Sequence, residues 1–171
     1  MELVEKNLKT DQIVLTVGYD IENLTDTFRR EDYCGEITTD HYGRQIPKHA
    51  RGTANMGKYT SSTKLIREKT LELFDRIVDK KLLTRRITVT ANRLLTEEEA
   101  KKNVLMEQLS LFDDPKETIQ KDESEIREQQ MQKAVLSIKN RFGPNAILKG
   151  TSFQDSATGR ERNKSIGGHH E

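Results

Sequence analysis

The sequence predicts an α+β fold, a small and mostly antiparallel sheet backed by helices, and three observations lead to it. Residues 12–20, 48–58 and 85–95 alternate between apolar and polar side chains, as half-buried strands do. An apolar stripe with helical spacing lies between the second and third of these segments. Beyond residue 95 polar residues dominate, which predicts a C-terminal helical and flexible tail.

The composition fits one compact domain with appendages. Of 171 residues, 33% are hydrophobic and 33% charged, and the mean hydropathy is −0.81. No apolar run is long enough to span a membrane, and the first residues lack the apolar core of a signal peptide. The single cysteine, Cys34, excludes an intramolecular disulfide and fits a reducing compartment. We therefore expect a cytoplasmic protein with no membrane partner.

The first half of the domain predicts a strand followed by a long excursion. Residues 2–9 are typical of the end of a short helix. In the strand at 12–20, Ile13, Leu15, Val17 and Tyr19 point to one side. Residues 21–47 are polar and rich in turn formers, and they predict a hairpin around residues 40–43.

The second half predicts a strand, a helix and a strand. In the strand at 48–58, Ala50, Gly52, Ala54 and Met56 alternate with polar residues. A Thr-Ser-Ser cap then opens a helix whose stripe contains Leu65, Ile66, Leu73, Phe74, Ile77 and Val78. In the strand at 85–95, Ile87, Val89 and Ala91 are expected to point inward.

These patterns divide the chain into four parts. Residues 1–95 are the expected folded domain, and residues 96–122 an exposed linker. Residues 123–150 hold an amphipathic helix, ended by Gly143 and Pro144, with a short extension. Residues 151–171 are the expected flexible tail.

Charge is distributed in blocks although the whole chain carries a net charge of only +1. Residues 48–93 contain twelve Lys or Arg against four Asp or Glu, a net charge of +8. The outward side chains of the two later strands are short hydrogen-bonding groups and guanidinium groups: Arg51, Thr53, Asn55, Arg86, Thr88, Thr90 and Asn92. Such a face suits a nucleic-acid backbone, because these groups reach phosphate oxygens without reading bases. The alternative is an ordinary solvated sheet face.

The scarcity of aromatic side chains near this face indicates which kind of nucleic acid it would bind. Only Tyr59 lies near the basic strands, so the sequence offers no aromatic platform for single strands and favours duplex backbone. We assign no catalytic residue and no metal ligand. Glu97 to Glu99 are adjacent acids of a solvated helix face, and Cys34 has no base partner.

A short apolar motif lies in the polar linker expected at residues 96–122. Leu109, Leu111 and Phe112 lie among Glu, Gln, Lys and Asp, in the sequence QLSLF. In an exposed segment, Leu111 and Phe112 can enter an apolar pocket while the Gln108 amide makes directional hydrogen bonds. Alternatively, the three apolar side chains pack the connector onto the domain.

The order of these segments resembles a known family. IVLTVGYD, then KHARGTANMGKYTSSTKLIREKTLELFDRIVDKKLLTRRITVTANRLL, then QLSLF, is similar to the carboxy-terminal portion of bacterial Y-family translesion DNA polymerases of the UmuC/DinB-like class. The resemblance covers about residues 2–112. RFGPNAIL and RNKSIGGH in the tail are similar to the ends of such polymerases from Gram-positive bacteria and their mobile elements. The excursion at 21–47 is longer than the family's usual connection.

The resemblance implies a fold, partners and residues. The fold is the little finger domain, a four-stranded, mostly antiparallel sheet backed by two helices in a βαββαβ-like order, here within residues 1–95. The partners are duplex or primer-template DNA, a bacterial sliding clamp, and the palm, fingers and thumb of the polymerase. The residues that would bind the clamp are Gln108, Leu109, Ser110, Leu111 and Phe112. The residues that would contact DNA phosphates are Lys48, Arg51, Thr53, Lys58, Arg85, Arg86 and Thr88.

The resemblance also limits what this chain is expected to do alone. The palm, with its carboxylates and Mg²⁺, is missing, so no cofactor is expected here and the chain would not polymerise DNA by itself. Met1 would be an internal or added start within an error-prone polymerase of SOS-type damage tolerance. Two other interpretations stay open. One is a free-standing DNA-binding or clamp-adaptor protein, and the other is an oligomerisation module built on the helix at 123–142.

Overall fold

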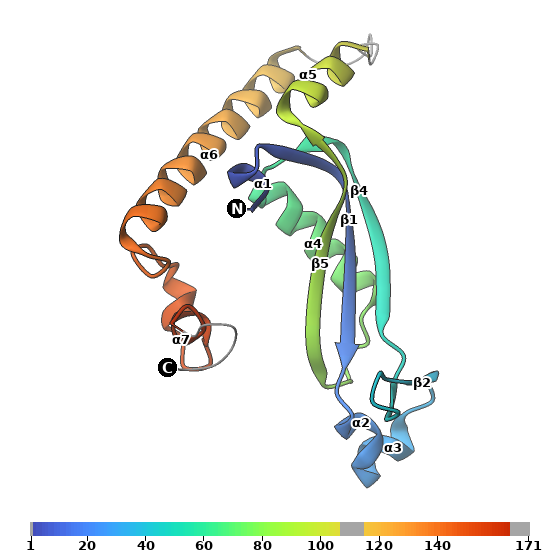
Figure 1. The fold of residues 1–171 in the computed structure, drawn as a ribbon. Coiled ribbons are helices and arrows are strands. Elements are labelled where there is room, and N and C mark those ends of the chain that lie inside the picture. Colours follow the sequence, from blue (N-terminus) through green and yellow to red (C-terminus); the bar gives the residue numbers. More distant parts are fainter. Residues whose placement is uncertain (1, 107–114, 165–171) are drawn as a thin grey trace. The chain divides into compact units, whose positions relative to one another are not determined.

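The computed structural model describes residues 2–106 and 115–164, with only the backbone described at residue 101 and within 103–122. The chain divides into two compact units. One runs from Asn7 to Gln108, and the other combines Met1–Lys6 with Leu109–Glu171. The fold is α+β, as the sequence predicts (Figure 1).

The first unit is built on a three-stranded antiparallel sheet in the order β4-β1-β5. Strand β1 (Leu8–Tyr19) lies in the centre and pairs with β4 (Ala50–Thr60) and β5 (Thr84–Thr96). Each strand starts or ends within a few residues of its predicted bounds, because alternation is a direct consequence of one buried face.

Three strands, and not the expected four, form this sheet within the described residues. Strands β2 (Ile37–Thr39) and β3 (Gln45–Pro47) pair with each other as a separate hairpin. The hairpin predicted around residues 40–43 is thus confirmed. The helices α2 (Glu22–Thr25) and α3 (Thr27–Asp32) of the same excursion were not predicted, because helices of one or two turns leave too short a pattern.

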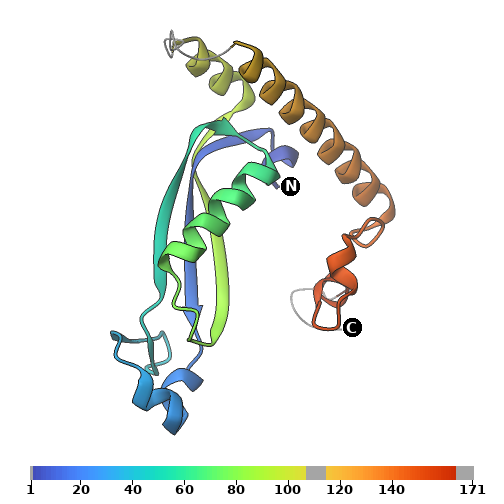
Figure 2. The ribbon, with the colours of Figure 1, turned by 180° about the vertical axis from the view of Figure 1, so that it is seen from behind.

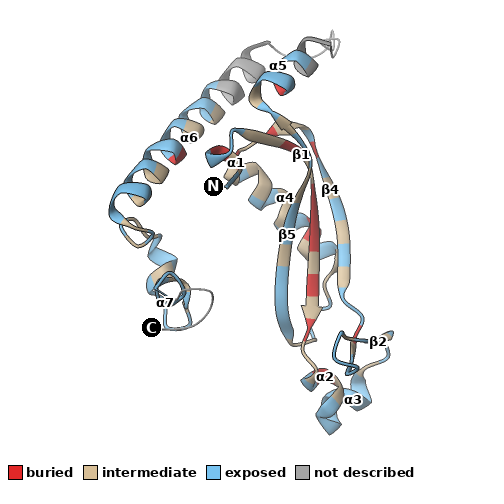
Figure 3. Cartoon of the chain, viewed as in Figure 1, coloured by how far each residue is buried: buried red, intermediate tan, exposed pale blue. Residues whose placement is uncertain are grey.

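Helix α4 (Thr63–Ile77) covers one face of the sheet, as Figure 2 shows from behind. It begins as predicted, since the Ser62 hydroxyl accepts a hydrogen bond from the Leu65 N–H at 3.2 Å. Leu73 of α4 packs with Leu15, Val17 and Tyr19 of β1 in the core. The central strand therefore holds most of the buried hydrophobic side chains (Figure 3).

The helix covers β4 and β1 and leaves β5 largely open. The register places Ile87 and Val89 on the helix side of the sheet, beside Val17 and Leu15, as expected from their alternation. Yet the two residues are 56% and 47% exposed. The inward direction predicted from the alternation is thus confirmed, but the helix does not extend far enough to cover these two side chains. Helix α5 (Glu97–Met106) contacts β5 and β1.

The second unit contains α1 (Glu2–Glu5) and the long helix α6 (Pro115–Phe142), which contact each other. Helix α6 begins inside the segment expected as a linker. It ends as predicted at Gly143, whose φ of 93° is unfavourable for other residues. The described part of the expected flexible tail contains a 3-10 helix (Gly150–Phe153) and α7 (Gly159–Arg162).

Candidate nucleic-acid interface

The face of the sheet opposite α4 is a continuous polar surface, which we call the outer face. Directly paired residues of antiparallel strands share a face, so the register defines its members. They are Gln12, Val14, Thr16 and Gly18 of β1, Arg51, Thr53 and Asn55 of β4, and Arg86, Thr88, Thr90 and Asn92 of β5. None of these residues is acidic. The outer face is seen towards the viewer in Figure 1.

One end of the outer face is joined by amide side chains. The Gln12 Nε2 group donates to Asn55 Oδ1 at 3.0 Å, and Asn92 Nδ2 donates to Gln12 Oε1 at 3.4 Å. A row of amides therefore crosses all three strands. Such a row is neutral, so it adds hydrogen-bonding capacity to this end without adding charge.

The other end of the outer face is cationic. Arg51 lies opposite Thr16, and Arg86 lies opposite Gly18, on the two sides of β1. From the spacing of strands and residues, their Cα atoms are about 12 Å apart. Both side chains belong to exposed residues, and neither has an ion-pair partner among the described residues.

Elsewhere in the basic block, several cations are already paired. Lys69 pairs with Glu72 at 2.8 Å, Lys80 with Asp75 at 2.6 Å, and Arg93 with Asp11 at 3.2 Å. Arg51 and Arg86 are thus among the cations of the block that form no ion pair within the described residues. An anion that approaches the outer face meets guanidinium groups with open donors.

The structure brings together four of the seven residues expected at phosphate. Arg51, Thr53, Arg86 and Thr88 lie on the outer face. Arg85 falls at a register shift between Gly18 and Tyr19 and has no paired residue opposite it. Lys58 follows Gly57, whose φ of 77° marks the irregularity where the alternation of β4 breaks.

Lys48 lies away from the strands and holds the base of the hairpin. Its Nζ forms an ion pair with Glu36 at 2.6 Å, and its N–H donates to the Glu36 carbonyl at 2.8 Å. The sequence did not predict this pairing, because residues 36 and 48 are brought together only by the β2–β3 hairpin.

The turn between β2 and β3 is a feature that the sequence analysis did not treat as functional. Tyr42 stands there with 78% of its surface exposed. The Arg44 guanidinium carbon lies 5.1 Å from the centre of the Tyr42 ring, and the His41 ring lies edge-on at 5.5 Å. In the sequence, this site could have been recognised from an aromatic residue placed between a turn-forming Asp and a Gly.

Asp40 holds this turn in shape. Its Oδ1 accepts from the N–H groups of Tyr42 and Arg44, each at 2.9 Å, and its Oδ2 accepts from Arg44 Nε at 2.8 Å. The hydrogen bond from the Arg44 side chain is the main cause that lowers the pKa of the Asp40 carboxyl below its usual value. The turn therefore keeps its carboxylate throughout the neutral range.

The clamp-type motif, Gln108 to Phe112, lies outside the described residues. Within the described residues, no three His, Cys, Asp or Glu side chains are grouped as metal ligands. No described helix is long and apolar enough to cross a membrane. Cys34 is an exposed free thiol.

Comparison with known proteins gives no relative for this chain. No protein-family model, curated protein or solved structure matches it. The function is therefore inferred from the residues and geometry of the chain itself.

Proposed function

We propose that this chain is the DNA-gripping, clamp-binding carboxy-terminal region of an error-prone lesion-bypass DNA polymerase of the Y family. The observation that carries the proposal is the outer face. It is free of acidic residues and crossed by short polar side chains, and Arg51 and Arg86 stand unpaired at one end of it. The alternating strands, the capped helix and the QLSLF motif support the family assignment by their order in the sequence.

The chemistry of the outer face favours backbone over base recognition. Thr and Asn side chains are too short to enter a groove from a flat sheet, but they can donate to phosphate oxygens at its surface. The face carries no aromatic side chain, so it offers nothing on which bases could stack. A grip of this kind tolerates distorted template bases, because it does not depend on their identity.

The remaining parts of the proposal concern the whole polymerase. The palm, fingers and thumb, with Mg²⁺ held by palm carboxylates, would supply the chemistry. This chain would hold the primer-template and bind the clamp through Gln108, Leu109, Ser110, Leu111 and Phe112. Tethering to a clamp that encircles DNA raises the local concentration of the polymerase at the primer end.

Replacing Arg51 and Arg86 together by alanine is the direct test of the DNA contact. We expect affinity for a blunt duplex to fall about tenfold or more near 50 mM salt, because two phosphate contacts are lost. The slope of log affinity against log salt should become shallower by about 1.8. Fluorescence anisotropy with a labelled duplex over about 50 to 200 mM salt measures both quantities.

A charge-matched variant controls for the general loss of positive charge. Lys69→Gln with Lys80→Gln also removes two charges, but both lysines are already paired with carboxylates. It should retain most of the affinity and the salt slope. Equal losses in the two double variants, or wild-type binding that is indifferent to salt, would contradict a phosphate grip on the outer face.

The clamp contact has its own test. Leu111→Ala with Phe112→Ala should abolish micromolar binding to a purified bacterial sliding clamp, because the two apolar anchors are removed. Isothermal titration calorimetry compares the variant with the wild-type chain. The double variant should still bind duplex DNA normally. If the wild-type chain does not bind the clamp, the motif has another role and the clamp part of the proposal is wrong.

A further inference from the structure

The turn from Asp40 to Arg44, which we call the hairpin tip, is exposed and closed by several hydrogen bonds. In addition to the bonds made by the Asp40 carboxylate, the Asp40 N–H donates to the Arg44 carbonyl at 2.9 Å and the Gly43 N–H to the Asp40 carbonyl at 3.0 Å. Gly43 has a φ of 78°, which other residues adopt only with strain. Backbone and side-chain hydrogen bonds together therefore stabilise this conformation of the tip.

The side chains of the hairpin tip suit a nucleobase beside a phosphate. An exposed tyrosine ring is a stacking surface for any base, since every base has a π-face. The Arg44 guanidinium lies over the ring, and its charge is offset by its ion pair with Asp40. The one acidic group of the tip, Asp40, has only 15% of its side chain exposed and is neutralised by Arg44 at 2.7 Å.

The β2–β3 hairpin that carries the tip joins the sheet at the cationic end of the outer face. Strand β3 contacts β1 and leads through Lys48 and His49 into β4. Arg51 lies at the start of β4, and Arg86 lies at the start of β5, opposite the end of β1. The β2–β3 hairpin therefore follows the end of β1 (Figure 1), and the register places Arg51 and Arg86 at that same end of the sheet.

From this arrangement we infer that the hairpin tip stacks an unpaired base of single-stranded DNA that continues from a duplex held on the outer face. Tyr42 supplies the stacking ring, and Arg44, whose guanidinium has more N–H donors than its contacts with Asp40 use, can donate to the adjacent phosphate. This inference depends on the proposed DNA contact. It adds a preference for the junction between double-stranded and single-stranded DNA, which the outer face alone does not supply.

The test compares two DNA molecules with the same duplex, one blunt and one with a single-stranded extension of about five nucleotides. The wild-type chain should bind the extended molecule about fivefold or more tightly than the blunt one. Tyr42→Ala should lose this preference and retain blunt-duplex affinity. Tyr42→Phe should keep the preference, because the ring and not the hydroxyl makes the contact.

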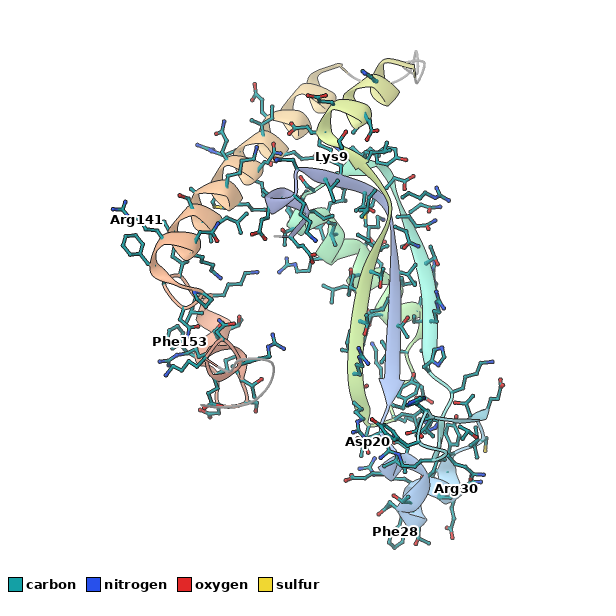
Figure 4. All side chains as sticks on the ribbon, in the orientation of Figure 1. Lys9, Asp20, Phe28, Arg30, Arg141 and Phe153 are labelled. Carbon is teal, nitrogen blue, oxygen red and sulfur yellow. The ribbon has the colours of Figure 1, made fainter. Side chains whose placement is uncertain are left out.

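Phe28→Ala is the matched control for removing an exposed aromatic residue. Phe28 lies on α3 in the same excursion and is 83% exposed, and Figure 4 shows it pointing away from the sheet. This variant should keep the preference for the extended molecule. A 2-aminopurine base at the first unpaired position gives a second readout, since its fluorescence should change on binding to wild type and not to Tyr42→Ala.

The outcomes separate this inference from the proposed function. If Tyr42→Ala retains the preference for the extended molecule, the inference is overturned and the grip by Arg51 and Arg86 stands. The same holds if the wild-type chain binds both molecules equally, in which case the exposed tip suits a protein partner instead. If Arg51→Ala with Arg86→Ala leaves blunt-duplex affinity unchanged, the proposed DNA contact itself is overturned.

Discussion

Asn23→Ala is expected to lower the free energy of unfolding of the sheet-containing unit by about 2–3 kcal/mol. Asn23 is fully buried at the start of the excursion. Its Nδ2 donates to the carbonyls of Asp20 and Leu83, each at 2.9 Å, and its Oδ1 accepts from the Leu83 N–H at 2.8 Å. One side chain thus joins the end of β1 to the loop that precedes β5.

The cost of this variant comes from a backbone donor that loses its partner. The carbonyl of Leu83 still accepts from the Asp20 N–H at 2.8 Å, so it stays satisfied. The partly buried Leu83 N–H is left without the Asn23 acceptor, and an unsatisfied donor that is shielded from water is expensive. Urea-induced unfolding followed by far-UV circular dichroism measures the difference in free energy.

Thr25→Ala is the control for this prediction. Thr25 lies in the same short helix, but its hydroxyl makes only an exposed hydrogen bond of 3.4 Å to the Ile21 carbonyl. It should change the free energy of unfolding by less than about 0.5 kcal/mol. Equal stabilities of Asn23→Ala and Thr25→Ala would mean that the buried amide does not hold these segments together.

Asn23→Asp tests the same hydrogen bonds through the pH dependence of the free energy of unfolding. The carboxylate keeps the acceptor for Leu83 N–H but turns an oxygen towards two carbonyls in place of a donor. Burial and these carbonyls should raise the pKa of the introduced carboxyl above its unfolded value of about 3.9. The variant should therefore be least stable at neutral pH and regain stability as the pH falls through its folded pKa.

Gly52→Val is expected to destabilise the same unit by about 1–3 kcal/mol, although valine is favourable in a strand. Gly52 lies on β4 directly beneath α4. A Cβ atom at this position would stand 2.8 Å from Leu73 Cδ1 and 3.1 Å from Ile77 Cγ2. Leu73 is almost fully buried, so it has little room to move. Thermal unfolding followed by circular dichroism measures the loss.

Two further variants show whether the close approach of the helix is the cause. Gly18→Ala should be tolerated, because a Cβ at that position meets only ordinary contacts such as Arg86 Cβ at 3.8 Å. Combining Gly52→Val with Leu73→Ala should cost less than the sum of the two single changes, since the smaller residue makes room for valine. Strict additivity would show that the two positions do not compete for space.

Local patterns were sufficient for the elements with one buried face. The alternation in β1, β4 and β5, the Ser62 cap of α4 and the stop at Gly143 are encoded within a few residues each. The outer face was predictable for the same reason, because residues two apart in a strand point to the same side. Arg51, Thr53, Arg86 and Thr88 were therefore placed on it correctly.

Other features depend on neighbours that are distant in the sequence. The exposure of Ile87 and Val89 is decided by how far α4 extends across the sheet, which no pattern within β5 records. Lys48 is paired with Glu36 only because the hairpin closes between them. The Asn23 amide finds its partners at Leu83, sixty residues away.

By itself, then, the amino-acid sequence determined the class of fold, the strands with their two faces, and the cationic character of one region. Only the tertiary structure decided which cations stay unpaired, which apolar side chains are covered, and that the hairpin carrying Tyr42 joins the sheet at its cationic end. The physical reason is the sequence separation over which each kind of interaction acts. Periodicity and capping act between residues a few positions apart, whereas ion pairing, burial and the gathering of a binding surface depend on segments that meet only in the folded chain.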